Sequence, residues 1–80
     1  MITVIAPDEL KRHVSQNIIR LRKAQSIPQG ELADRIGISR VQLNRIENGH
    51  NLPSVELLYA IADELGVSAD DLRKICSSTH

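Results

Sequence analysis

The sequence has few aromatic residues and little cysteine. Tyr59 is the one aromatic side chain among 80 residues, since Phe and Trp are absent, so the core has to be aliphatic. Cys76 has no second cysteine to pair with, which excludes an internal disulfide and favours a reducing, cytoplasmic setting. An aliphatic core in one small domain is thin, and a second subunit would bury more apolar surface. We therefore expect a homodimer.

Long apolar runs are also missing, and so is the basic region with which a leader segment typically starts. No stretch approaches the roughly 20 apolar residues of a membrane span, and no basic region precedes the apolar residues 2–5. We expect a cytoplasmic protein with no membrane partner, and no second domain that would sense a small-molecule ligand.

The residue clusters that catalysis or metal binding requires do not occur in the sequence. The carboxylate pairs at 63–64 and 70–71 fall in helix turns, where they act as solvated or dipole-pairing charges. No glycine-rich phosphate loop is present. The histidines and the cysteine lack the spacing of metal ligands: His13, His50, His80 and Cys76. We expect no enzymatic activity, no metal and no cofactor.

The formal net charge is zero, but its two signs are divided between the halves of the chain. Residues 11–45 carry eight basic side chains against two acidic ones, a balance of +6. Residues 46–80 carry two basic side chains against six acidic ones, a balance of −4. A basic half and an acidic half would orient the molecule in the field of a polyanion. Chance scatter of charge in so short a chain is the alternative explanation.

Helical periodicity predicts an all-α chain, a compact bundle of five helices. Apolar residues three and four apart recur between clear start and stop signals. We expect residues 1–7 to be an extension that frays or forms a short strand, and residues 77–80 to be a disordered tail. Residues 8–76 form the domain, whose first helix ends near residue 25 and whose last runs from 69 to about 76.

The stretch 29–48 has the pattern of two short helices joined by a tight turn. Gly37 is able to adopt the left-handed conformation that ends one helix and starts the turn. Ser39, followed three residues later by Gln42, predicts a capping box at the second helix. Apolar residues give each half one buried face: Leu32, Ile36, Leu43 and Ile46. Such a pair makes a helix-turn-helix unit.

The outer face of the second helix carries the side chains opposite Leu43 and Ile46. Arginine can donate two hydrogen bonds to guanine, asparagine can pair with adenine, and valine can contact a thymine methyl group. This face therefore suits the edges of base pairs, and an ordinary solvated helix face is the alternative. Its residues are two arginines, two asparagines and a valine: Arg40, Val41, Asn44, Arg45 and Asn48.

With these motifs the chain resembles the Xre/Cro-type helix-turn-helix proteins, which include phage repressors. The resemblance runs from about residue 17 to residue 72 and is specific because its elements occur in order. It implies a five-helix domain of the phage-repressor type that binds double-stranded DNA as a dimeric transcriptional regulator. It rests on Gln29, Leu32-Ala33, Gly37-Ile38-Ser39, Leu43, Ile46-Glu47-Asn48-Gly49, Pro53-Ser54 and Leu65-Gly66-Val67.

The resemblance also implies roles for individual residues. Gln29 and Asn48 would contact backbone phosphates, and Gln42 ranks below them because the capping box engages it. Arg22 and Glu47 would form a structural ion pair. Four residues would face base edges in the major groove: Arg40, Val41, Asn44 and Arg45.

The sequence departs from the family at two places. Pro28 stands where a Ser, Thr or Asn cap is usual, although Ser26-x-x-Gln29 offers a displaced capping box that would draw Gln29 away from phosphate. His50 and Asn51 replace the basic residues often found after the second helix, which predicts fewer phosphate contacts and a shallower salt dependence.

Two questions stay open at this level. The subunit contact is expected either at the last helix, through Leu72, Ile75 and the nearby Tyr59, or at the N-terminal strand. The second functional hypothesis is a protein-interaction module, an antitoxin or adaptor of the same fold, which the acidic C-terminal half supports weakly.

Overall fold

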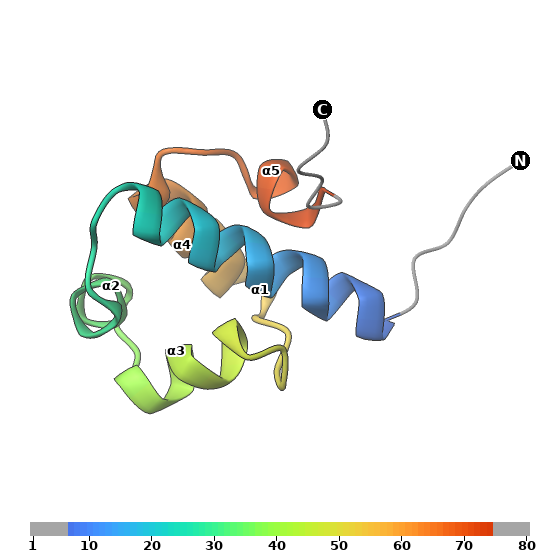
Figure 1. The fold of residues 1–80 in the computed structure, drawn as a ribbon, viewed down its shortest axis with the longest axis horizontal. Helices are drawn as coiled ribbons and strands as arrows, with labels where there is room; N and C mark the ends of the chain where they lie inside the picture. Colours follow the sequence, from blue (N-terminus) through green and yellow to red (C-terminus); the bar gives the residue numbers. More distant parts are fainter. Residues whose placement is uncertain (1–6, 75–80) are drawn as a thin grey trace, which may run out of the picture.

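The computed structural model describes residues 7–74, which fold into five helices connected by short loops (Figure 1). This confirms the predicted all-α fold. Our predictions for the N-terminal extension, Ile75, Cys76 and the tail lie outside the described residues. The helices are α1 (Pro7–Ala24), α2 (Gln29–Ile36), α3 (Arg40–Glu47), α4 (Val55–Leu65) and α5 (Ala69–Arg73).

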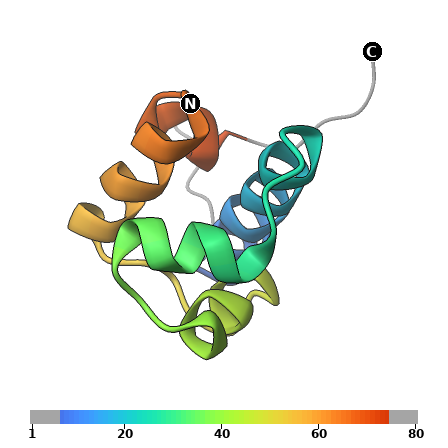
Figure 2. The same ribbon diagram turned by 90° about the vertical axis from the view of Figure 1, so that its left-hand side faces the viewer.

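The long α1 forms the middle of the molecule: α3, α4 and α5 pack against it, and α2 packs against α3 and α4. In Figure 1, α3 lies on one side of α1 and α5 on the opposite side, while Figure 2 shows α2 between α1 and α4 with α3 below. Every helix contributes to a single aliphatic core, whose fully enclosed members include Ile18, Leu32, Leu43, Ile61 and Leu72. Because Leu72 is fully enclosed, the structure contradicts our prediction that it contacts a second subunit.

The helix starts follow the predicted caps, with two corrections. The Ser39, Ser54 and Ser68 side chains each accept a hydrogen bond from a backbone N–H in the first turn of α3, α4 and α5. At α3 one half of the predicted capping box forms, because Ser39 accepts from the Gln42 N–H without a return bond from the Gln42 side chain. The displaced box at Ser26 is wrong: the N-cap of α2 is Pro28, and no side chain caps it.

Helix α5 is shorter than we predicted and ends at Arg73 rather than near Cys76. Lys74 adopts an extended conformation at its C-cap. The buried Asn17 side chain on α1 explains this end, because its Nδ2 donates to the carbonyl oxygens of Leu72 and Lys74, each at 2.8 Å. Both donors of one amide thus hold the last turn of α5 against α1.

Some apolar side chains of α4 and of the loop before it are on the surface. Val55 opens the helix directly after its Ser54 cap and is 69% exposed, whereas Leu57 and Leu58 pack against the core. Tyr59, one turn further on, is 61% exposed, and Leu52 in the preceding loop is 42% exposed. These three side chains form an apolar patch on the outer side of α4. None of the helices within residues 7–74 has the length and apolar character needed to cross a membrane.

Candidate nucleic-acid interface

The turn between α2 and α3 fixes how the second helix of the unit is presented. Gly37 adopts a left-handed conformation with φ of 79°, as predicted, and ends α2. Its N–H donates to the Asp34 carbonyl oxygen at 3.2 Å, and the Ile38 N–H donates to the Ala33 carbonyl oxygen at 3.0 Å. A residue with a side chain would be strained at this φ, whereas glycine adopts it without strain. The turn leaves α3 crossing α2 at one end of the molecule (Figure 2).

Helix α3 has one buried side and one exposed side, and the residues on each are those that its apolar periodicity predicted. Leu43, Ile46 and Glu47 are buried against α1 and α2. On the opposite side Val41 is 65% exposed. The predicted recognition residues lie together on this exposed side: Arg40, Val41, Asn44, Arg45 and Asn48.

Two hollows divide the exposed face, and Asn44 lines both. The first, of about 320 Å³, lies at the N-terminal end of α3 and is also lined by Gln29, Arg40 and Val41. The second, of about 380 Å³, lies at the C-terminal end and is also lined by Arg45, Asn48 and His50. The first residue of α2 and the loop after α3 therefore flank the recognition residues at either end.

A buried ion pair joins α1 to the end of α3. Arg22 Nε donates to Glu47 Oε2 at 2.7 Å and its Nη2 donates to Oε1 at 3.0 Å, so the contact is bidentate. Their side chains are 11% and 4% exposed. Arg22 Nη1 also donates to the Ile27 carbonyl oxygen at 2.8 Å. One guanidinium thus ties α1, the loop before α2 and α3 together, as the structural role suggested by the resemblance requires.

Gln29 is linked to the same carboxylate. Its Nε2 donates to Glu47 Oε1 at 3.1 Å, so Glu47, and not the alternative cap at Ser26, engages this side chain. The half-buried Gln29 keeps one N–H and its oxygen for another partner. The carboxylate orients the amide at the edge of the first hollow.

Gln42 lies on the flank of α3 rather than among the recognition residues. It lines a hollow of about 390 Å³ with Lys11, His50 and Ser54, between the start of α1 and the loop before α4. Our sequence reasoning missed Lys11 as a residue of this end of the molecule. Its charge was counted, but the packing of α1 against α3 that places it there has no local signal in the sequence.

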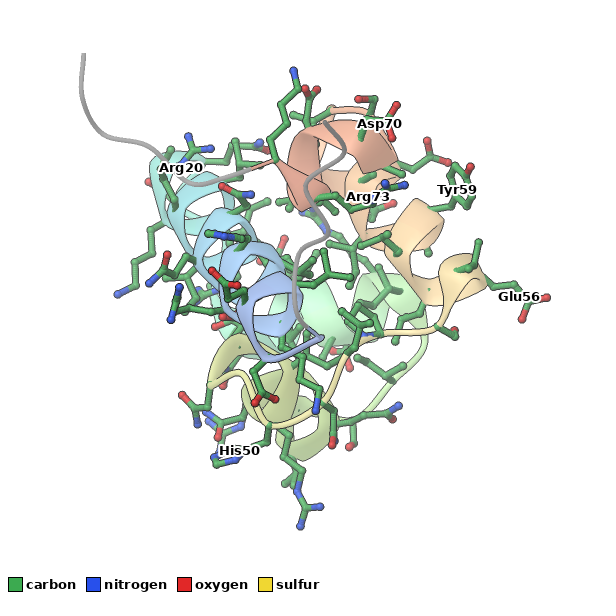
Figure 3. The ribbon with its side chains drawn as sticks, turned by 90° about the vertical axis from the view of Figure 1, so that its right-hand side faces the viewer. Arg20, His50, Glu56, Tyr59, Asp70 and Arg73 are labelled. Carbon is green, nitrogen blue, oxygen red and sulfur yellow. The ribbon has the colours of Figure 1, made fainter. Side chains whose placement is uncertain are left out.

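The arginines of α3 differ from those of α2 and α5 in their ion pairing. Arg40 and Arg45 are exposed and make no ion pair with any described residue, whereas Arg35 pairs with Glu31 and Glu64. On α5, Arg73 and Lys74 are likewise paired with Asp70 and Asp71. Figure 3 shows His50 at the α3 end and Asp70 at the opposite end. Unpaired positive charge therefore remains at the face of α3.

Sequence reasoning also missed two polar side chains that hold the helices together. Asn17 fixes α5, as described above, and Gln25 Nε2 donates to the Leu65 carbonyl oxygen at 2.7 Å at the end of α4. A polar residue beside the apolar stripe of α1 is the only signal that the sequence offers for Asn17. Within the described part of the chain, no group of three or more His, Cys, Asp and Glu side chains is placed to hold a metal.

Comparison with known sequences gives matches over most of the chain. The helix-turn-helix model HTH_3 matches residues 18–72. The chain is 39% identical over 59 residues to the cryptic phage CTXphi transcriptional repressor RstR of Vibrio cholerae, covering 74% of this chain and 53% of that protein. It is 36% identical over 64 residues to the uncharacterized HTH-type transcriptional regulator y4dJ of Sinorhizobium fredii, covering 80% and 83%. It is 41% identical over 59 residues to the antitoxin PezA of Streptococcus pneumoniae, covering 74% and 37%. The chain thus spans about half the length of the first of these relatives.

Comparison with solved structures gives the same fold. The clp gene regulator ClgR from Corynebacterium glutamicum matches with a TM-score of 0.74 at 30% identity, covering 79% of this chain and 82% of that one. Hydroxypropylphosphonic acid epoxidase from S. wedmorenis matches with a TM-score of 0.78 at 20% identity, covering 84% and 36%. The second likeness is one of fold alone, so an activity has to be argued from the residues of the site.

Proposed function

The chain belongs to the helix-turn-helix family HTH_3, and from this membership we propose that it binds double-stranded DNA sequence-specifically as a small transcriptional regulator. Helix α3 enters the major groove with its exposed face toward the base pairs. The observation that carries this proposal is the composition of that face. Its unpaired arginines, asparagines and exposed valine match the donors and the methyl contact that major-groove edges accept.

The roles of the individual residues follow from their positions around the two hollows. Arg40, Val41, Asn44 and Arg45 contact bases, because they lie on the exposed side of α3. Gln29, at the first turn of α2, donates its remaining N–H to a backbone phosphate, supported by the positive end of the helix dipole. Asn48 and Gln42 lie at the edges of the face, where DNA phosphates approach.

A homodimer completes the proposal. The apolar patch of Leu52, Val55 and Tyr59 continues into a groove of about 260 Å³ that Leu10 and Leu58 also line. Figure 3 shows Tyr59 on the same flank as Asp70 and Arg73, which line that groove too. Burying this patch between two copies compensates for the thin core. Two recognition helices about 34 Å apart then reach successive major grooves on one side of the duplex.

The test is a gel-shift titration of a duplex pool with random sequence, carried out at two salt concentrations. Binding is expected at micromolar protein or below, and it weakens between about 50 mM and 200 mM salt because released counterions are part of the driving force. Sequencing of the bound fraction should return a two-fold symmetric site. No detectable binding at micromolar protein at either salt concentration would reject DNA binding.

A protein-interaction module is the second candidate, and two observations favour it. One relative bears the name of an antitoxin, and the apolar groove on α4 offers a surface for another protein. The same gel-shift experiment separates the two functions, since an interaction module without DNA affinity leaves the duplex unshifted. A site-specific complex that forms with the isolated chain favours the regulator.

A further inference from the structure

Asn44 and Asn48 lie one helical turn apart on the exposed face of α3, and their side chains are hydrogen-bonded to each other. Asn48 Nδ2 donates to Asn44 Oδ1 at 2.9 Å. The backbone N–H of Asn48 also donates to the Asn44 carbonyl oxygen at 2.9 Å, which keeps the two residues side by side at the end of the helix. The Asn44 amide therefore has a preferred direction before any DNA arrives.

The direction of this hydrogen bond decides which end of the Asn44 amide makes no bond within the protein and is free to contact DNA. The bond to Asn48 engages the oxygen, which lies on the C-terminal side of the residue. Because the amide is planar, its NH₂ group is then held on the edge of the amide away from this bond. Asn44 also lines the first hollow, together with Gln29, Arg40 and Val41.

An asparagine whose oxygen already accepts a hydrogen bond recognises DNA bases differently from a free asparagine. A free asparagine recognises adenine with both ends, since its oxygen accepts from N6 while its NH₂ donates to N7. When Asn48 engages the oxygen, one of its two lone pairs is occupied and the amide is held in one orientation, so the NH₂ group is the end that is fully free for the bases, and it suits acceptors. Guanine presents two acceptors, N7 and O6, in the major groove, whereas adenine presents one acceptor and one donor.

We propose that Asn48 is a positioning residue which, by holding the oxygen of Asn44, makes Asn44 a hydrogen-bond donor and favours guanine over adenine at the base pair that it faces. This inference rests on the proposed function, because it assigns a base preference to the face of α3. The neighbouring arginines are donors as well. The polar groups of the recognition face are thus mainly donors, and the bound half-site carries acceptors opposite them.

The test is selection of bound duplexes from a random pool, followed by sequencing, for the wild type and single variants. Asn44→Ala should lose its base preference at one position of the selected site, and that position is the base pair that Asn44 faces. Asn48→Ala frees the oxygen, so adenine should gain on guanine at that same position by about fivefold or more, within the range of one bidentate contact. Asn48→Gln retains an amide donor and should keep the wild-type preference.

A second variant reverses the direction of the amide. Asn48→Asp offers only acceptors, so the NH₂ group of Asn44 turns to it and the oxygen faces the bases, which should enrich adenine or cytosine at that position. Asn51→Asp adds the same charge in the exposed loop and serves as the matched control, with weaker binding overall but unchanged preference. Circular dichroism checks that each variant folds.

The outcomes separate this inference from the proposed function. If the wild type enriches no sequence, both are rejected. If the wild type selects a site but Asn48→Ala weakens binding uniformly, with the Asn44 position unchanged, Asn48 contacts phosphate alone and the positioning role is rejected. The positioning role is also rejected if Asn48→Asp and Asn51→Asp select the same base at the position that Asn44 faces.

Discussion

At the scale of single residues, the strongest expectation concerns Arg40. It stands at the first position of α3, is exposed and makes no ion pair with a described residue, so its five donors are available for a guanine. We predict that Arg40→Ala costs about 1–3 kcal/mol of specific binding and relaxes base preference at one position. Competition with the selected duplex and with random duplex measures both quantities. Equal losses for the two duplexes would make Arg40 a phosphate contact instead.

Glu47 gives a prediction about stability at the same scale. Its carboxylate is buried and accepts from Arg22 and Gln29, so removing it leaves a buried guanidinium without its partner. We predict that Glu47→Ala lowers the free energy of unfolding by about 3–5 kcal/mol.

The double variant Arg22→Met/Glu47→Leu removes both charges and should recover a large part of that loss, because apolar pairs often replace buried ion pairs without cost. Urea unfolding of the wild type, the single variants Arg22→Met and Glu47→Leu, and the double variant measures the coupling energy between the two side chains. Additive losses would show that the two side chains do not act as a pair, contrary to their bidentate contact.

At the scale of elements, the α1–α5 contact depends on one side chain. Asn17 satisfies two carbonyl oxygens at the end of α5 with a single amide, and α5 is only five residues long. We predict that Asn17→Ala destabilises the protein by about 1–3 kcal/mol, because the buried Leu72 carbonyl and the partly buried Lys74 carbonyl lose their donor. Hydrogen exchange should rise first in α5. Unchanged protection there would mean that core packing of Leu72 alone holds the helix.

The start of α5 gives a pH-dependent prediction. The Ser68 backbone N–H, which donates to the Asp71 carboxylate, holds the pKa of that group below its ordinary value of 3.8, and Lys74 contributes in the same direction. A lowered pKa in the folded state means that the stabilisation is present above the ordinary value and is lost as the pH falls through the folded one. Thermal unfolding of Asp71→Asn should therefore differ from the wild type near neutral pH and converge with it in acid. A constant difference would contradict this.

At the scale of the whole molecule, the fold was accessible from sequence because each helix carries its own signals. Apolar spacing and serine caps set the helices, and Gly37 marked the turn. What escaped prediction depends on contacts between distant segments. Asn17 ends α5 from 55 residues away, and Glu47 rather than Ser26 engages Gln29. The exposed face of α3 was predictable from periodicity, whereas the bond that orients Asn44 depends on side-chain rotamers.

The apolar patch on α4 gives a prediction about how two copies of the chain assemble. Tyr59 is exposed beside Val55 on α4 and makes no contribution to the aliphatic core, so a charge there should leave the fold intact. If this patch joins two copies, Tyr59→Asp places two carboxylates in an apolar interface, and sedimentation should show a shift from dimer to monomer. Binding to a full symmetric site should weaken much more than binding to a half-site, because the two recognition helices are no longer linked. Asp63→Asn, an exposed change of charge on the same helix, serves as the control and should leave the dimer intact. A Tyr59→Asp protein that still sediments as a dimer would place the subunit contact elsewhere on the molecule.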